Sequence, residues 1–263
     1  MLGQRQAPSP GEPARRPTTL ERVLGWCVHA YTALGLVAAA VMAVLLVQGG
    51  ATAFRWCFLL MALATIVDAT DGALARKVRI KEVVPGFDGR RLDDIIDYLN
   101  YTFLPMLLIW RAGILPAGQE AWLILALLAS IYGFCQVQAK TDDGYFLGFP
   151  SLWNLVAFYL YVLPLGPWAS LGVVILLSLL TFVPSKYLYP SQPGAFNRLA
   201  TALGVLWAFL IGWSIWILPE DGSPAEAGSL LSLTSVSLVY PAFYMGASWV
   251  ITLRDWWRRK PPV

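Results

Sequence analysis

The stretch Asp68-x2-Asp71-Gly72-x2-Ala75-Arg76-x12-Gly89-x3-Asp93-x3-Asp97 decides how this chain folds and what chemistry it can carry out. Its aspartates lie at the ends of two apolar runs: Asp68 closes the first, and Asp93 and Asp97 open the second. Carboxylates at the ends of membrane-length helices cost free energy unless they are paired or bind a cation, so they mark function. Oxygen ligands on two facing helices suit a hard divalent ion such as Mg²⁺ or Mn²⁺, which in turn suits phosphate chemistry.

The composition around this stretch is that of a polytopic membrane protein. Hydrophobic residues make up 57% of the 263 residues and charged residues only 13%, whereas a soluble domain carries roughly 25% charged residues. A helix needs about 20 residues to cross the hydrocarbon core of a bilayer. The apolar ranges of this kind are 23–47, 54–67 (extending as a helix to about 78), 92–110, 121–139, 152–165, 168–184, 199–218 and 230–253. We therefore expect an all-α transmembrane bundle with eight spans, the fifth and sixth forming a tight hairpin at Gly166 and Pro167.

Basic residues predict the orientation of these spans. Of the 19 Lys and Arg residues, only Arg55 and Arg111 fall on the outer side when both termini face the cytoplasm. The inner set is Arg5, Arg15, Arg16, Arg22, Arg76, Lys77, Arg79, Lys81, Arg90, Arg91, Lys140, Lys186, Arg198, Arg254, Arg258, Arg259 and Lys260. This bias predicts a multi-pass inner-membrane protein with the aspartates at the cytoplasmic face. The net charge of +3 follows from the same bias, so it indicates no nucleic-acid partner.

The chain divides into three parts. Residues 1–17 are rich in Pro, Arg and Gly and are expected to form a disordered cytoplasmic arm. Residues 18–255 form the membrane domain, which Thr18-x2-Glu21 opens with the pattern of a helix capping box. Residues 256–263 are a cytoplasmic tail.

Helical periodicity brings the aspartates together. At 100° per residue, Asp68 and Asp71 lie about 60° apart on one helix, and Gly72 and Ala75 lie within about 40° of Asp68. Asp93 and Asp97 are one turn apart on the next helix, and a helical hairpin brings the two pairs close. Four adjacent carboxylates repel one another in a low dielectric, so the arrangement calls for metal charge. Two divalent ions could clamp a pyrophosphate and polarise one phosphorus.

Nearby arginines allow a second interpretation. Arg76 has the fork geometry that fits phosphate oxygens, but Arg76, Arg90 and Arg91 could instead neutralise the aspartates in buried salt bridges. Asp94 faces about 100° away from Asp93. We expect it at the rim of the site, paired with Arg90 or Arg91.

The motif resembles the signature of the CDP-alcohol phosphotransferase family at all eight positions. These membrane enzymes transfer a phosphatidyl or similar group from a CDP-linked donor to an alcohol. Twelve residues separate Arg76 from Gly89, more than in most members. That spacing, the larger number of spans and the flanking segments 85–89, 97–103 and 149–154 are similar to the bacterial phosphatidylcholine synthases. The resemblance covers roughly residues 20–255.

The resemblance implies a role for each motif residue. It implies one metal ion held by Asp68, Asp71 and Asp93 and a second held by Asp68, Asp93 and Asp97. The ions would be Mg²⁺ or Mn²⁺, and Asp97 would also be the general base. The residues implied for binding the CDP donor are Asp71, Gly72, Ala75, Arg76 and Gly89.

A choline acceptor would need aromatic faces, because a quaternary ammonium has no N–H to donate. The candidates for acceptor binding are Tyr101, Trp153, Asn154, Ser185 and Tyr187. Lys186 stays open between a cytoplasmic anchor and a ligand for a lipid phosphate.

The resemblance implies that CDP-diacylglycerol and choline react to give phosphatidylcholine and CMP. Serine or another alcohol as acceptor is the nearest alternative, as in phosphatidylserine synthases. A cation transporter lined by the aspartates is a different class, but the other spans offer almost no polar residues for a path. Membrane lipids are expected partners, and the family often forms homodimers.

Overall fold

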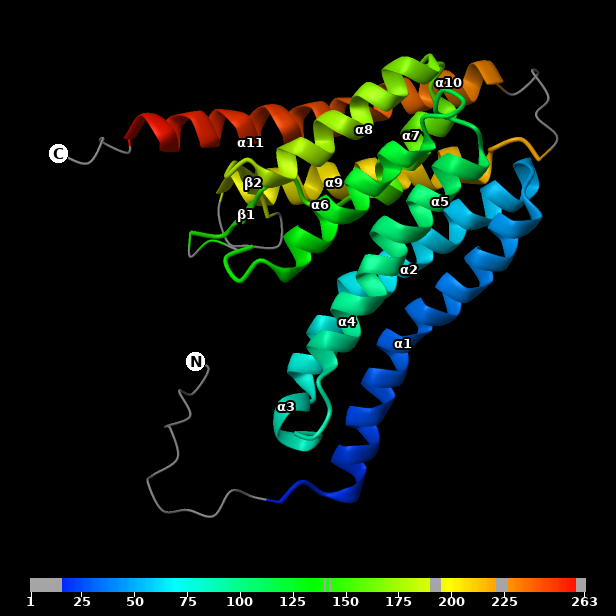
Figure 1. The fold of residues 1–263 in the computed structure, drawn as a ribbon. Helices are drawn as coiled ribbons and strands as arrows, with labels where there is room; N and C mark the ends of the chain where they lie inside the picture. Colours follow the sequence, from blue (N-terminus) through cyan, green and yellow to red (C-terminus); the bar gives the residue numbers. More distant parts are fainter. Residues whose placement is uncertain (1–15, 140, 142, 190–194, 221–226, 259–263) are drawn as a thin grey trace.

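The computed structural model describes residues 16–139, 141, 143–189, 195–220 and 227–258. The predicted arm and tail therefore lie mostly outside the described residues. The described elements are α1 (Thr19–Gln48), α2 (Ala51–Lys77), α3 (Ile80–Val83), α4 (Gly89–Tyr98), η1 (Leu99–Phe103), α5 (Leu104–Arg111), η2 (Glu120–Trp122), α6 (Leu123–Cys135), β1 (Tyr145–Leu147), α7 (Trp153–Val162), α8 (Pro167–Phe182), β2 (Lys186–Leu188), α9 (Ala195–Trp216), α10 (Ala227–Ser237) and α11 (Val239–Arg258). The described part of the chain is thus almost entirely helical (Figure 1).

Helices α1 and α2 form a long antiparallel pair (Figure 1). The predicted capping box begins α1: the Thr18 hydroxyl accepts from the Glu21 N–H at 3.2 Å, and the Glu21 carboxylate accepts from the Thr18 N–H at 2.8 Å. Gly49 and Gly50 make the turn to α2 with φ angles of 71° and 91°. These are left-handed values that glycine adopts without steric cost, which is why the turn can be this short.

The third helical segment runs through α4, η1 and α5 and contains a wide turn after Asp97. Pro105 has no N–H to donate to the Tyr101 carbonyl, so regular α-helical pairing is interrupted there. The Leu104 N–H bonds instead to the Leu99 carbonyl, five residues back, and η1 is a π-helix. Such single π turns often occur at functional sites.

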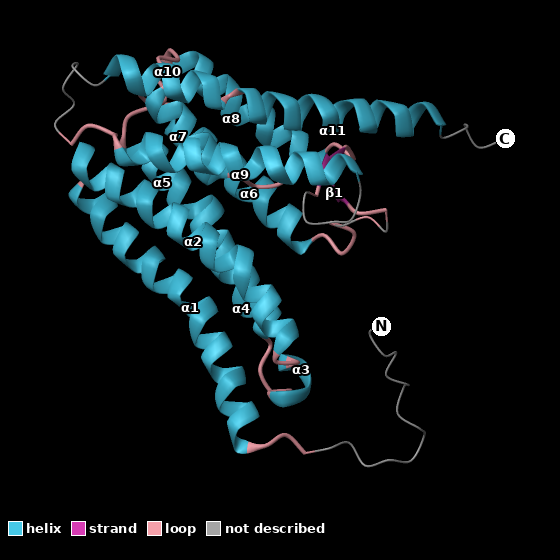
Figure 2. Cartoon of the chain, turned by 180° about the vertical axis from the view of Figure 1, so that it is seen from behind, coloured by secondary structure: helices cyan, strands magenta, loops and turns pink. Residues whose placement is uncertain are grey.

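The lower ends of α1, α2 and α4 extend together away from α8, α9 and α11 (Figure 2). Small residues let α1 approach its neighbours closely in this part. A Cβ atom on Gly35 would lie 2.6 Å from the Ile96 Cγ2 atom, and one on Gly25 would lie 2.8 Å from the Val84 Cγ2 atom. The four motif aspartates belong to α2 and α4, within this close-packed group of helices.

The predicted all-α architecture is confirmed, and a small two-stranded sheet is its one addition among the described residues. Strands β1 and β2 pair antiparallel, with Tyr145 opposite Leu188 and Leu147 opposite Lys186. Pro150 follows β1, and Pro184 precedes β2. Each proline favours extended backbone in the residue before it, which ends helical structure there. The turn predicted at Gly166 is present, since α7 ends at Val162 and α8 begins at Pro167. The two helices do not pack together as the predicted tight hairpin, because α8 packs mainly against α6 and α7 mainly against α5.

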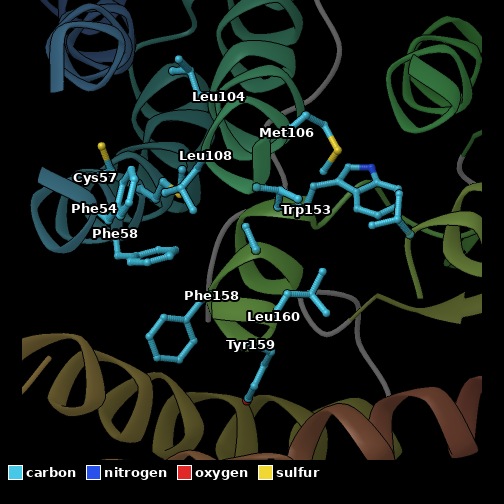
Figure 3. Packing of buried hydrophobic residues seen from close by; sticks show 14 of the residues in the cluster. Phe54, Cys57, Phe58, Leu104, Met106, Leu108, Trp153, Phe158, Tyr159 and Leu160 are labelled. Atoms are coloured by element: carbon cyan, nitrogen blue, oxygen red, sulfur yellow. The ribbon is translucent and has the colours of Figure 1, made fainter. Parts of the chain in front are cut away.

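A buried hydrophobic cluster runs through the bundle and includes residues of α2, α5 and α7 that pack together (Figure 3). Phe58 of α2 packs edge-on against Phe158 of α7, with ring centroids 5.4 Å apart. Leu108 of α5 has no exposed surface. Burial of such large side chains contributes roughly 1.5–3 kcal/mol each, so this cluster anchors α2 to the rest of the bundle.

Among the described residues, four helical stretches are long and apolar enough to cross a membrane: Thr19–Gln48, Ala51–Lys77, Leu199–Trp216 and Gly228–Arg258, the last of which comprises α10 and α11. Helices occupy all eight predicted ranges. However, α7 has 10 residues, about 15 Å at the usual helical rise, against a core of about 30 Å. Large apolar side chains such as Phe209 and Val250 are exposed, as a lipid-facing surface requires. The chain is an integral membrane protein; the count of eight spans stays a prediction.

Candidate metal centre

Three aspartates from two helices converge. Asp68 and Asp71 of α2 and Asp93 of α4 each offer a carboxylate oxygen, and the three oxygens lie within 4.8 Å of one another. Asp71 is buried, and the other two are half-buried. The convergence predicted from helical periodicity is therefore confirmed for these three. The Asp97 carboxyl follows one turn after Asp93 and lies within electrostatic reach of all three.

Neutral hydroxyl groups hold two of these carboxylates. The Thr32 hydroxyl of α1 donates to Asp71 Oδ2 at 2.8 Å. The Tyr101 hydroxyl, presented by the π turn, donates to Asp68 Oδ2 at 2.8 Å. Neither of these two bonds brings positive charge to the centre. Sequence reasoning missed Thr32 altogether and placed Tyr101 with the acceptor.

The arginines of α4 pair elsewhere. Arg90 lies 3.9 Å from Asp94, as predicted for the rim, and Arg91 lies 3.8 Å from Asp88. The salt-bridge interpretation therefore loses two of its three candidate cations. An all-oxygen donor set with at least three carboxylates fits a hard divalent ion, Mg²⁺ or Mn²⁺. The residues of this centre thus fit the metal that the motif implies.

Arg76 and Gly72 lie together on α2. A Cβ atom on Gly72 would lie 3.4 Å from Arg76 Nη1, so the guanidinium folds back over the glycine. Arg76 is exposed and Ala75 is half-buried. Gly72 and Ala75 are small, so they leave space for the Arg76 guanidinium to approach a phosphate group beside the aspartates.

Gly89 has a packing role that the sequence did not reveal. A Cβ atom at this position would lie 2.6 Å from the His29 Cε1 atom. The His29 ring is buried and packs against Phe87, with ring centroids 4.5 Å apart. The start of α4 therefore rests directly on α1, and glycine is the residue that permits it.

The acceptor candidates separate into two groups. Tyr101 contacts Asp68, and Asn154 donates to the Thr65 hydroxyl at 3.4 Å, one helical turn before Asp68. Trp153 is fully buried and donates to the Ser130 hydroxyl at 2.8 Å, inside the core (Figure 3).

Ser185, which directly precedes strand β2, and Tyr187, which lies within it, are also buried. The Tyr187 ring packs near Phe149 and Tyr244. Among the described contacts, none joins Ser185 or Tyr187 to the aspartates. The structure thus brings Tyr101 and Asn154 to the motif and places Trp153, Ser185 and Tyr187 in packed surroundings.

Lys186 is the centre of an ion-pair cluster. Its ammonium lies 2.6 Å from Asp143 and 3.2 Å from Asp255, and 5.5 Å from the centre of the Tyr145 ring. Burial disfavours the charged forms of both Asp143 and Lys186. The hydrogen bond and the electrostatic attraction to Lys186 nevertheless lower the pKa of the Asp143 carboxyl. The same partners raise the pKa of Lys186 against the effect of burial. The lysine therefore ties the sheet to α11; the two roles left open from sequence stay untested.

Comparison with known proteins identifies the family. The family model described as CDP-alcohol phosphatidyltransferase matches residues 29–184, which include all four aspartates. The chain is 38% identical over 240 residues to a phosphatidylcholine synthase of Pseudomonas aeruginosa, covering 91% of this chain and 96% of the relative. It is 30% identical over 233 residues to a phosphatidylcholine synthase of Borreliella burgdorferi, covering 88% and 96%. The chain belongs to the CDP-alcohol phosphatidyltransferase family.

Proposed function

We propose that this protein is a phosphatidylcholine synthase, which transfers the phosphatidyl group from CDP-diacylglycerol to choline and releases CMP. The observation that carries the proposal is the convergence of Asp68, Asp71 and Asp93 within 4.8 Å. It occurs in a chain that is 38% identical, over nearly its whole length, to a protein of that name. Serine as acceptor, giving a phosphatidylserine synthase, is the alternative that shares this chemistry.

Two divalent ions fit the carboxylates best in the following assignment. Asp68, Asp71 and Asp93 hold the first ion, and Asp68, Asp93 and Asp97 hold the second. When bound, the ions supply charge neutralisation for the pyrophosphate and for the leaving phosphate. In this assignment, Asp68 and Asp93 each bind both ions. The positive charge of the ions offsets the repulsion among four carboxylates in a small volume.

The chain's own groups bind the donor and move one proton. Arg76 offers its fork of N–H groups to the phosphate oxygens, with Gly72 and Ala75 leaving room beside it. Asp71 and Gly89 border the donor site. Asp97 takes the proton of the acceptor hydroxyl as that oxygen attacks the phosphorus that carries diacylglycerol. The new P–O bond forms, the bond to CMP breaks, and CMP leaves as an anion.

The acceptor side lies beside Asp68 in this proposal. Tyr101 and Asn154 are the two candidates that stand next to the motif, and the Tyr101 ring offers a face for a trimethylammonium group. Trp153, Ser185 and Tyr187 are assigned to packing instead, because they are buried among other partners.

The orientation follows from the basic residues. Arg76 and Lys77 close α2 at the end that carries the motif, and Arg79 and Lys81 follow at α3. We place this end at the cytoplasmic face of the inner membrane, with both termini on the same side and the spans numbering eight. A water-soluble acceptor and the leaving CMP would then both be on the cytoplasmic side.

Competition between acceptors tests the proposal. Purified protein in detergent micelles is given CDP-diacylglycerol, Mn²⁺ and equal concentrations of labelled choline, serine, inositol and glycerol 3-phosphate. We expect label from choline to dominate in the phospholipid product. Preferred incorporation of serine would overturn the choline assignment and leave phosphatidyl transfer intact, whereas no labelled lipid from any acceptor would contradict both.

A further inference from the structure

Helix α1 meets α2 through two neighbouring hydrogen bonds. Tyr31 and Thr70 are bonded through their hydroxyl groups at 2.8 Å. The next residue along each helix forms the second bond, from the Thr32 hydroxyl to Asp71 Oδ2, also at 2.8 Å. The two bonds join the same pair of helices at nearly the same level along the helix axes. They differ mainly in the groups that they join: the first joins two hydroxyl groups, and the second joins a hydroxyl group to a carboxylate.

The surroundings of the two bonds are different. The Tyr31–Thr70 bond is exposed, whereas Thr32 and Asp71 are only 8% and 6% exposed. A threonine inside a helix usually bonds to the carbonyl four residues back. In Thr32 that contact, to the Val28 carbonyl, is 3.4 Å long, and the contact to Asp71 is 0.6 Å shorter (3.4 − 2.8). The single hydroxyl proton of Thr32 therefore points to the carboxylate.

This bond constrains a group that otherwise has freedom to turn. A buried carboxylate needs a partner, and a charged partner would compete with a metal ion for it. A neutral hydroxyl satisfies one lone pair of Asp71 and restricts the rotation of the carboxylate without adding charge. Hydrogen bonds of this kind to ligating groups orient them, and their loss typically weakens metal binding by about 10–100-fold.

We infer that Thr32 is a positioning residue for Asp71, so that α1, which supplies no carboxylate to the centre, takes part in metal binding. The inference rests on the proposed metal centre. No local sequence pattern indicates this role, because Thr32 lies within the apolar range 23–47 and 39 residues before its partner.

The test is a titration of full-length purified protein with Mn²⁺, followed by the electron paramagnetic resonance signal of the free ion. Thr32→Val keeps the shape of the side chain and removes the hydroxyl, and Thr32→Ser keeps the hydroxyl. Tyr31→Phe is the matched control, because it removes the neighbouring bond between the same helices. Thermal unfolding without metal is measured for every variant.

We expect Thr32→Val to raise the Kd for Mn²⁺ by about 10–100-fold. Thr32→Ser and Tyr31→Phe should bind Mn²⁺ as the wild type does, and Thr32→Val should unfold near the temperature of Tyr31→Phe. If Thr32→Val is not recovered in folded form, Thr32→Ala replaces it with the same expectation.

The other outcomes are separable. Wild-type protein that binds no Mn²⁺ would refute the proposed metal centre itself. Wild-type affinity in Thr32→Val would refute the inference alone. Equal weakening in Thr32→Val and Tyr31→Phe would mean that packing of α1 on α2 matters and that the hydroxyl on Asp71 does not.

Discussion

In the proposed mechanism, all four aspartates of the motif hold metal, and one of them, Asp97, also moves a proton. Carboxylate oxygens of Asp68 on α2 and Asp93 on α4 lie within 4.8 Å of each other, and the proposed mechanism assigns both residues to two ions. Asp97 lies one turn further along α4, close enough to interact electrostatically with the other three aspartates. One of its oxygens can bind a metal ion while the other accepts the proton of the acceptor hydroxyl.

Replacing Asp97 should therefore separate binding from turnover. Asp97→Asn is expected to lower kcat by about 10² or more, the usual effect of losing a general base, while binding of CDP changes little. Asp68→Asn should instead weaken Mn²⁺ and CDP binding together, because Asp68 is assigned to both ions. CMP release and nucleotide binding by calorimetry measure the two effects. Near-normal turnover in Asp97→Asn would exclude it as the base.

At this scale, periodicity predicted the aspartates well, because residues three or four apart on a helix share a face whatever surrounds them. It could not predict the partners of those aspartates. Thr32 and Tyr101 lie 39 and 33 residues from the carboxylates they hold. Those contacts depend on how the helices pack, which has no local pattern, and on the π turn at η1, which Pro105 favours but does not by itself specify.

At the scale of elements, the position of α4 depends on its contact with α1. Gly89 begins α4 directly on the His29 ring, and Gly35 lets Ile96 approach further along. The family resemblance assigns Gly89 to binding of the CDP donor. The structure adds a steric reason for glycine at this position, the close contact with His29, which involves no substrate. The two explanations predict different behaviour on substitution.

Gly89→Ala should lower the free energy of unfolding by about 1–3 kcal/mol, the usual cost of overpacking. Its Cβ atom would lie 2.6 Å from His29. The double variant with His29→Ala should recover part of that loss. Gly86→Ala is the control, since a Cβ atom there meets nothing within 4 Å. Unchanged stability in Gly89→Ala with loss of CDP binding would favour the donor role alone.

The Lys186 cluster makes the attachment of the sheet dependent on pH. The pKa of Asp143 is lowered, so its contribution to stability is present above the unfolded pKa and is lost as pH falls through the folded value. The pKa of Lys186 is raised, so its contribution is lost only as pH rises through the folded value. Both are fully present near neutral pH.

Lys186→Met should therefore flatten the acid side of the stability profile. Thermal unfolding is measured from about pH 7 down to about pH 3, through the range in which aspartates titrate. The difference between wild type and variant should shrink as the pH falls. Lys81→Met, at an exposed lysine of α3, is the control. A difference that stays constant with pH would show that the ion pair with Asp143 contributes nothing.

At the scale of the whole molecule, composition predicted an integral membrane protein and hydrophobic runs located every described helix of spanning length. The runs could not show that α7 is short or that α10 and α11 follow one another with a break at Leu238. They also missed the sheet of β1 and β2, because three-residue strands have too few residues to show an alternating pattern.

The central claim is that this membrane protein performs metal-dependent phosphatidyl transfer to choline. The most direct measurement follows CMP release and phosphatidylcholine formation together, with purified protein, CDP-diacylglycerol and choline, before and after exhaustive chelation. We expect the two products to appear in equal amounts, to stop on chelation and to return with Mg²⁺ or Mn²⁺. Undiminished formation of both products after chelation would contradict the account.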